Sequence, residues 1–137
     1  MNGSPLILHV DDDEDILWVT SLALESVGGL AMVQCDSGFK ALDLAREHQP
    51  NLFLLDVMMP EIDGVETLKR LREIEGFENT PAIFLTAKAS RENIQALMDA
   101  GAIAVLPKPF DPMTIASEIV ALWQSAFQAQ MSTENVA

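Results

Sequence analysis

Five side chains of this sequence have the types needed to hold a divalent cation and a phosphoryl group. They are three carboxylates, a hydroxyl and an ammonium, on Asp11, Asp12, Asp56, Thr86 and Lys108. Oxygen ligands alone favour a hard ion, Mg²⁺ or Mn²⁺, over zinc, which prefers histidine and cysteine. A cation, a lysine and a hydroxyl can bind the oxygens of a phosphoryl group. A carboxylate in the same site can act as the nucleophile and form an acyl phosphate.

Asp56 stands at the end of an apolar run, Leu52-Phe53-Leu54-Leu55, and precedes Val57-Met58-Met59-Pro60. A continuous apolar run of this length is typical of a strand buried on both faces. Taking a lone carboxylate out of water is expensive, so Asp56 must lie at the open mouth of a sheet or have a positive partner. Taken alone, this stretch also fits a solvated loop aspartate after a strand.

The other four residues follow apolar runs of strand length as well. Such runs cover residues 5–10, 30–35, 81–86 and 103–106. Between and after them, apolar residues recur at helical spacing over residues 16–27, 37–48, 63–74, 90–100 and 111–126. Strict alternation with short connections predicts one α/β domain with a doubly wound, five-stranded parallel sheet covered by helices on both faces. Functional groups gather beyond the carboxyl ends of such strands, so the five side chains are expected at one rim.

Composition narrows the class of protein. The chain has 137 residues, is 49% hydrophobic and carries a formal charge of −13 from 21 acidic and 8 basic side chains. This balance argues against nucleic acid as a partner, because phosphate backbones require clustered lysine and arginine. The single cysteine, Cys35, excludes an internal disulfide and fits a reducing compartment. No signal peptide or membrane span is visible, so we expect a cytoplasmic protein with a domain over 1–128 and a frayed tail over 129–137.

The carboxylates themselves predict a cation. Each close pair repels by roughly 4 kcal/mol at an effective dielectric near 20, and a divalent ion would remove that cost. His9 and His48 lie too far from the other residues in the strand pattern to be ligands, and we expect both to be structural. Neither a Walker loop nor a Rossmann fingerprint is present, so the phosphoryl donor must come from outside.

Four motifs carry a family resemblance: Val10-Asp11-Asp12, Leu55-Asp56-Val57-Met58-Met59-Pro60 with Asp63-Gly64, Leu85-Thr86-Ala87, and Lys108-Pro109-Phe110. With these motifs in this order, residues 5–127 resemble a response-regulator receiver domain of two-component signalling, of the stand-alone, single-domain type. The resemblance implies a flavodoxin-like sheet with strand order 2-1-3-4-5.

The resemblance also implies a role for each site residue. Asp56 would accept a phosphoryl group from a sensor histidine kinase or histidine phosphotransferase, by self-catalysed phosphorylation with slow autodephosphorylation rather than as an enzyme. Asp11 and Asp12 would hold Mg²⁺ together with Asp56 and the backbone carbonyl of Met58. Thr86 and Lys108 would bind phosphoryl oxygens, with a cis peptide bond between Lys108 and Pro109. A monomer or weak dimer would signal by contact with an unknown output protein, or carry the phosphoryl group onward in a phosphorelay.

The sequence departs from the family pattern at Val105, where many receivers carry a tyrosine or phenylalanine that switches on activation. A valine has little reach, so the switch must work differently, or the domain acts mainly as a carrier. Trp18 and Leu22 lie off the apolar stripe of their helix. Our hypothesis is that they help dock the kinase or phosphotransferase, and the alternative is that they are merely partly buried surface residues.

Three alternatives remain open: a receiver segment of a larger hybrid kinase or regulator, a degenerate receiver that only binds partners, and a phosphatase or phosphotransferase of the haloacid-dehalogenase type. Met58 stands where the last would need a second aspartate, which argues against it.

Overall fold

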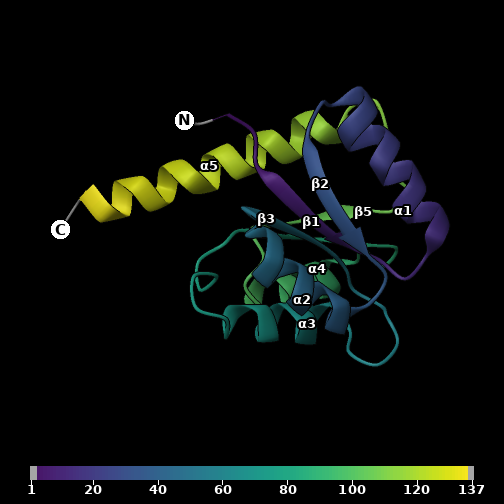
Figure 1. Ribbon diagram of the computed structural model, residues 1–137, viewed down its shortest axis with the longest axis horizontal. Coiled ribbons are helices and arrows are strands. Elements are labelled where there is room, and N and C mark those ends of the chain that lie inside the picture. The colour runs from purple at the N-terminus through teal and green to yellow at the C-terminus, as the bar shows by residue number, and fades with distance from the viewer. Residues whose placement is uncertain (1–2, 136–137) are drawn as a thin grey trace.

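The computed structural model describes residues 3–135, with side chains through residue 130. Its centre is a five-stranded sheet (Figure 1), made of β1 Leu6–Val10, β2 Ala31–Cys35, β3 Leu52–Asp56, β4 Ala82–Thr86 and β5 Ala104–Pro107. The strand order is β2-β1-β3-β4-β5, and every neighbouring pair is parallel. The predicted fold class and strand order are confirmed.

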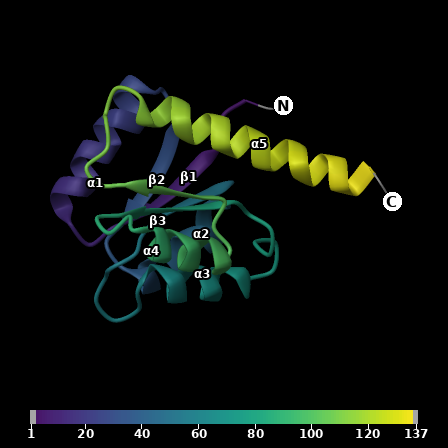
Figure 2. The ribbon, with the colours of Figure 1, turned by 180° about the vertical axis from the view of Figure 1, so that it is seen from behind.

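Helices cover both faces of this sheet. Figures 1 and 2 show α2 (Gly38–His48), α3 (Gly64–Arg72) and α4 (Arg91–Asp99) on one face, with α1 (Glu14–Ser21) and α5 (Ile115–Asn135) on the other. Along β3 the side chains alternate between the two layers. Phe53 and Leu55 pack with the α2–α3–α4 layer, while Leu52 and Leu54 pack with the α1–α5 layer. All four are fully buried, which explains why the sequence of β3 is apolar without alternation.

Capping side chains begin the helices where the sequence predicts. Ser37 accepts a hydrogen bond from the backbone N–H of Lys40, and Asp63 accepts one from that of Glu66. Ser90 plays the same part for α4. Such caps satisfy N–H groups that have no partner within the helix and are worth about 1 kcal/mol each. The cap of Asp63 also fixes the loop between Asp56 and α3.

The first helix differs from its prediction. It begins at Glu14 with Asp13 as its N-cap, and from Leu22 to Val27 it continues as a π-helix, η1. Gly28 follows η1 and lies so close to α5 that a Cβ on it would be 2.4 Å from Cβ of Ala116. Apolar spacing predicts a helix here but does not distinguish the two hydrogen-bond patterns.

The last helix also differs at both ends. Asp111 and Pro112 start a turn, in which the N–H of Ile115 donates to the carbonyl oxygen of Asp111, and α5 itself begins at Ile115. At its other end α5 continues to Asn135, so residues 129–135 are helical, where the sequence suggested a frayed tail from 129; residues 136 and 137 lie outside the described part. This stretch contains no glycine or proline to stop a helix, and Nε2 of Gln130 donates to the carbonyl oxygen of Asn79 at 2.7 Å.

Candidate functional site: an acidic cluster with a lysine

The parallel pairing brings the predicted residues to one edge of the sheet. Val10 pairs with Leu55, so Asp11 and Asp56 leave neighbouring strands side by side. On the other side of β3, Thr86 pairs with Pro107, and Lys108 follows directly. Residues far apart in the chain thus meet because the carboxyl ends of β1, β3, β4 and β5 lie at the same edge.

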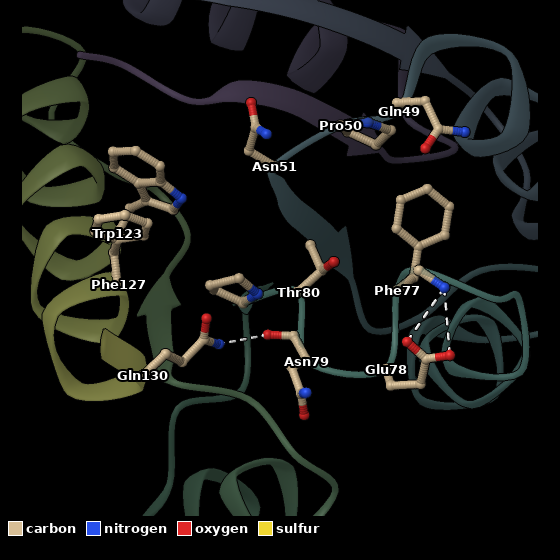
Figure 3. A pocket seen from close by; sticks show the side chains of 12 residues that line it. Gln49, Pro50, Asn51, Phe77, Glu78, Asn79, Thr80, Trp123, Phe127 and Gln130 are labelled. Carbon is tan, nitrogen blue, oxygen red and sulfur yellow. Dashed lines mark hydrogen bonds between the residues drawn. The ribbon is translucent and has the colours of Figure 1, made fainter. Parts of the chain in front are cut away.

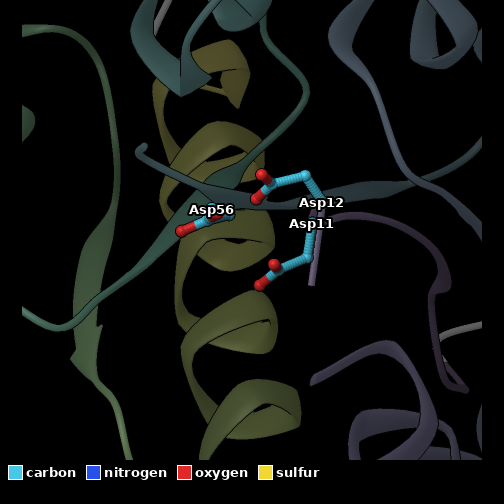
Figure 4. Close-up of side chains that lie close together, drawn as sticks. All are labelled: Asp11, Asp12 and Asp56. Carbon is cyan, nitrogen blue, oxygen red and sulfur yellow. The ribbon is translucent and has the colours of Figure 1, made fainter. Parts of the chain in front are cut away.

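Three carboxylates form a compact cluster at this edge (Figure 4). One oxygen each from Asp11, Asp12 and Asp56 lies within 4.8 Å of the others. Asp11 is fully buried and Asp56 is 6% exposed, whereas Asp12 is exposed. Two buried carboxylates beside an accessible one are open to solvent at one side, which suits a hydrated hard cation that keeps some of its waters. The donor set therefore fits Mg²⁺ or Mn²⁺.

Lys108 compensates part of this charge. Its Nζ lies 2.8 Å from Oδ2 of Asp11 and 3.0 Å from Oδ1 of Asp56. The predicted cis peptide bond between Lys108 and Pro109 is present. The backbone N–H of Lys108 also donates to the carbonyl oxygen of Thr86 at 2.9 Å, which ties β5 to β4 at the site. The three carboxylates still carry two more negative charges than this one ammonium neutralises.

The surroundings shift the ionisation of both partners. Burial raises the pKa of Asp56 from 3.8 to about 6; the hydrogen bond from Lys108 opposes this shift, and the charges of Asp11 and Asp12 add to it. Burial lowers the pKa of Lys108, but its hydrogen bonds to Asp11 and Asp56 outweigh that effect, and the net shift is upward. Lys108 therefore remains a cation, while Asp56 is a carboxylate that gains from a further positive charge.

Thr86 reaches the site, but its hydroxyl is engaged elsewhere. It is 4% exposed, and its Oγ1 accepts a hydrogen bond from the N–H of Lys88 at 3.0 Å. It also lies 3.4 Å from the carbonyl oxygen of Lys88. The structure thus places Thr86 beside the cluster without a hydrogen bond to Asp56. To bind a group on Asp56, the hydroxyl would have to leave Lys88.

The loop after β3 adds two features. Met58 is exposed, and its carbonyl accepts no hydrogen bond from the described residues, so it is available as a ligand. Gly64 lies against the backbone of Asp56, since a Cβ on it would be 2.1 Å from the carbonyl oxygen of that residue. Only glycine allows this approach. The Asp63-Gly64 motif was visible in the sequence, but the reason for its glycine was not.

The side chains of the histidines and the cysteine are not among the clustered ligand atoms, although the backbone carbonyl of Cys35 accepts from the N–H of Asp11 at 3.2 Å. His9 is fully buried, with Nδ1 at 3.0 Å from Nε2 of Gln34, and burial, helped by the charge of Lys108, lowers its pKa to about 3. His48 lies at the end of α2. Burial raises the pKa of the Cys35 thiol to about 11, so this thiol is unreactive at neutral pH. Among the side chains described, those of residues 3–130, Asp11, Asp12 and Asp56 form the only cluster of three or more possible metal ligands.

A doubly wound sheet with an acidic cluster and a lysine at its carboxyl edge defines a phosphoacceptor type of signalling domain, and comparison with known proteins identifies the family. Residues 7–120 match the family model of the response regulator receiver domain. The chain belongs to this family. Its acidic cluster is of the kind that receiver domains use for Mg²⁺.

The chain is similar to some relatives of about its own length and to others that are longer. An uncharacterized 14.6 kDa protein of Leptolyngbya boryana is 40% identical over 109 residues, covering 80% of this chain and 82% of that protein. The polar-differentiation response regulator DivK of Brucella ovis is 34% identical, over 75% of this chain and 83% of its own. The transcriptional regulatory protein CseB of Streptomyces avermitilis is 37% identical over 85% of this chain, but the chain spans only 48% of its length.

Solved structures agree with the fold. The chemotaxis response regulator CheY4 of Vibrio cholerae superposes with a TM-score of 0.80 at 29% identity, covering 88% of this chain and 99% of the other. A CheY-like receiver domain protein of Methanospirillum hungatei gives a TM-score of 0.79 at 28% identity, over 93% and 99% of the two chains.

Proposed function

We propose that Asp56 is the phosphoacceptor of this receiver and that phosphorylation requires a divalent cation. The observation that carries the proposal is the position of Asp56 at the end of β3, 3.0 Å from Nζ of Lys108 and within 4.8 Å of Asp11 and Asp12. An oxygen of Asp56 attacks the phosphorus of a phosphohistidine. The phosphorus–nitrogen bond breaks, the imidazole leaves with the electron pair and takes up a proton, and Asp56 becomes an acyl phosphate.

The side chains around Asp56 supply the binding groups for this transfer. Asp11 and Asp12, with Asp56 and the carbonyl of Met58, would hold Mg²⁺, which screens the charge of the phosphoryl oxygens when it is bound. Lys108 already contacts Asp56 and would bind one phosphoryl oxygen. Thr86 would turn from Lys88 to bind another. The chain is thus a phosphoacceptor that also slowly hydrolyses its own acyl phosphate, and not an enzyme acting on a separate substrate.

The partners follow from this role. A receiver implies a histidine kinase, or a histidine phosphotransferase, as the phosphoryl donor. Trp18 and Leu22 are 68% and 38% exposed on the first helix, and we propose that they contribute to the donor's docking surface. Unchanged phosphotransfer from the native donor after Trp18→Ala with Leu22→Ala would exclude this. Within residues 3–135, no helix has the length and apolar character needed to cross a bilayer.

The conformational response to phosphorylation of Asp56 must operate with a valine at position 105. This residue pairs with Phe84 and packs in the α2–α3–α4 layer, where a tyrosine or phenylalanine would have more reach. We propose that movement of Thr86 and its loop transmits the phosphorylated state to an output protein, without an aromatic rotation. In a phosphorelay the group would instead pass to the next histidine.

The test compares the wild type with Asp56→Asn after incubation with acetyl phosphate and Mg²⁺. Mass spectrometry should show one added phosphoryl group in the wild type and none in the variant, and chelation of Mg²⁺ should prevent the addition. Asp43→Asn is the matched control, because this carboxylate is 86% exposed on α2. Phosphorylation of Asp56→Asn to the same extent would refute the assignment.

A further inference from the structure

A pocket of about 470 Å³ lies at the opposite edge of the sheet from Asp56. Its rim consists of residues 49–51 before β3, residues 76–81 before β4, and the second half of α5. It exists because α5 continues past the end of the sheet and forms a wall there (Figures 1 and 3). Its volume is in the usual range for small-molecule sites. The role proposed for Asp56 does not use this pocket.

Aromatic rings form the wall on α5. Trp123 and Phe127 are stacked, with ring centroids 5.8 Å apart and planes inclined by 21°. Phe127 is 41% exposed because it lies beside this hollow rather than in the core. The indole nitrogen of Trp123 is turned toward the hollow (Figure 3), and it makes no hydrogen bond to the described residues. Phe77, in the α3–β4 loop, also lines the pocket, but it is 4% exposed and packs edge-to-face on Phe53 in the core.

Carboxamides and a hydroxyl complete the lining. Asn51 uses its Oδ1 to accept from the N–H of Leu6, and Gln130 uses its Nε2 to donate to the carbonyl oxygen of Asn79. Nδ2 of Asn51, Oε1 of Gln130 and the side chains of Asn79 and Thr80 have no hydrogen-bond partner among the described residues. The pocket therefore offers both donors and acceptors beside flat apolar surfaces.

The lining carries little free charge. Its one ionisable side chain is Glu78, whose two oxygens accept from the N–H of Gly76 at 3.1 and 3.2 Å. No lysine or arginine lines the pocket, so an anionic ligand would find no counter-charge. The loop is held in place from within the protein, because Arg72 donates to the carbonyl oxygens of Phe77 and Thr80. The site is thus preformed and offers no counter-charge to an anionic ligand.

We propose that this pocket binds an uncharged planar heterocycle of the nucleobase or nucleoside class. The exposed ring of Phe127 would stack on the flat ring of the ligand, as aromatic side chains do with bases. Carboxamides present a donor beside an acceptor, which matches the hydrogen-bonding edge of a base. The lack of a cation disfavours a nucleotide phosphate. The site would give the receiver an input that is separate from phosphorylation.

The test uses Trp123 as reporter. The chain contains two tryptophans, and Trp18→Phe leaves Trp123 as the single fluorophore and the single indole N–H resonance. Adenosine and uridine are titrated as probes, with adenosine monophosphate and methyl glucoside in parallel. We expect a saturable shift of the Trp123 resonance with a nucleoside, weaker binding of the monophosphate and none of the glucoside.

Variants of the wall separate binding from folding. Phe127→Ala should weaken nucleoside binding roughly 5- to 150-fold, the range for loss of one base–aromatic stack. Phe39→Ala is the matched control, since Phe39 is 44% exposed on α2, outside the pocket, and should leave binding unchanged. Asn79→Ala removes a side chain without hydrogen bonds in the described structure, and should weaken binding even if Phe127→Ala proves unstable.

Three results would overturn the proposal. The first is an unshifted Trp123 resonance at millimolar adenosine and uridine. The second is nucleoside binding that Phe127→Ala and Asn79→Ala leave unchanged. The third is a preference for methyl glucoside or for the monophosphate, which would assign the pocket to another class of ligand. None of these results depends on phosphorylation of Asp56.

Discussion

The raised pKa of Asp56 predicts how Asp56→Asn changes the pH dependence of stability in the metal-free protein. Folding raises this pKa from 3.8 to about 6, chiefly through burial. Between these two values the folded state binds more protons than the unfolded state, so the free energy of unfolding falls as pH rises through this window. Well below pH 3.8 the carboxyl is neutral in both states, and well above pH 6 it is ionised in both.

The size of the effect follows from the shift. A difference of about two pKa units corresponds to about 3 kcal/mol, and the 6% exposure of Asp56 leaves little solvent screening. The wild type should lose this amount between pH 3.8 and roughly pH 7, whereas an asparagine does not ionise. The stability of Asp56→Asn minus that of the wild type should therefore increase by about 3 kcal/mol over the same range.

Urea unfolding in the presence of a chelator, repeated at several pH values, measures this difference. Subtracting the two proteins cancels the contributions of titrating groups that do not interact with Asp56, whereas those of Asp11, Asp12 and Lys108 enter the difference. Asp43→Asn, an exposed carboxylate, should show no comparable pH-dependent difference. Added Mg²⁺ should stabilise the wild type more than Asp56→Asn, because a ligand stabilises the state that binds it. A difference that stays constant or falls as pH rises would refute the reasoning.

Three further predictions test the surroundings of the site. Lys108→Ala leaves the buried carboxylate of Asp11 without its cation and should lower the free energy of unfolding without metal by about 3–5 kcal/mol in urea titrations; a loss under about 1 kcal/mol would contradict this. Gly64→Ala places a Cβ 2.1 Å from the carbonyl oxygen of Asp56 and should cost about 1–3 kcal/mol or more, while Gly3→Ala, which meets no atom within 4 Å, should cost nothing. His9 has its pKa lowered from 6.5 to about 3, so folding excludes its proton and stability falls as pH falls through this window, by up to about 5 kcal/mol. His9→Leu should remove that part of the acid destabilisation, and equal slopes of melting temperature against pH in the two proteins would exclude it.

Much of the site was predictable because it depends on strand ends. Asp11, Asp56 and Thr86 each stand at or directly after the end of an apolar run, and a parallel sheet brings such ends to one edge. The state of these side chains was not predictable. Whether Thr86 bonds to Lys88 or faces Asp56, and how far burial shifts the pKa of Asp56, depends on atoms contributed by several elements.

Other features lay beyond any pattern in the sequence. The π-helical end of the first helix keeps the same apolar spacing as an α-helix, so periodicity alone predicted one α-helix. The continuation of α5 to Asn135 was underestimated, because small and polar residues suggested fraying, while the contact from Gln130 to Asn79 joins it to a distant loop. The aromatic wall of the second pocket depends on that same continuation.

The sequence by itself determined the α/β alternation, the parallel sheet and the identity of the acidic cluster and its lysine, because these depend on local periodicity and on the order of motifs along the chain. Tertiary structure alone decided the distances: the 2.8 and 3.0 Å contacts of Lys108, the close approach of Gly64 to Asp56, and the hollow beside Trp123. Local propensities act over a few residues, whereas electrostatic shifts and pockets arise between residues that only folding brings together.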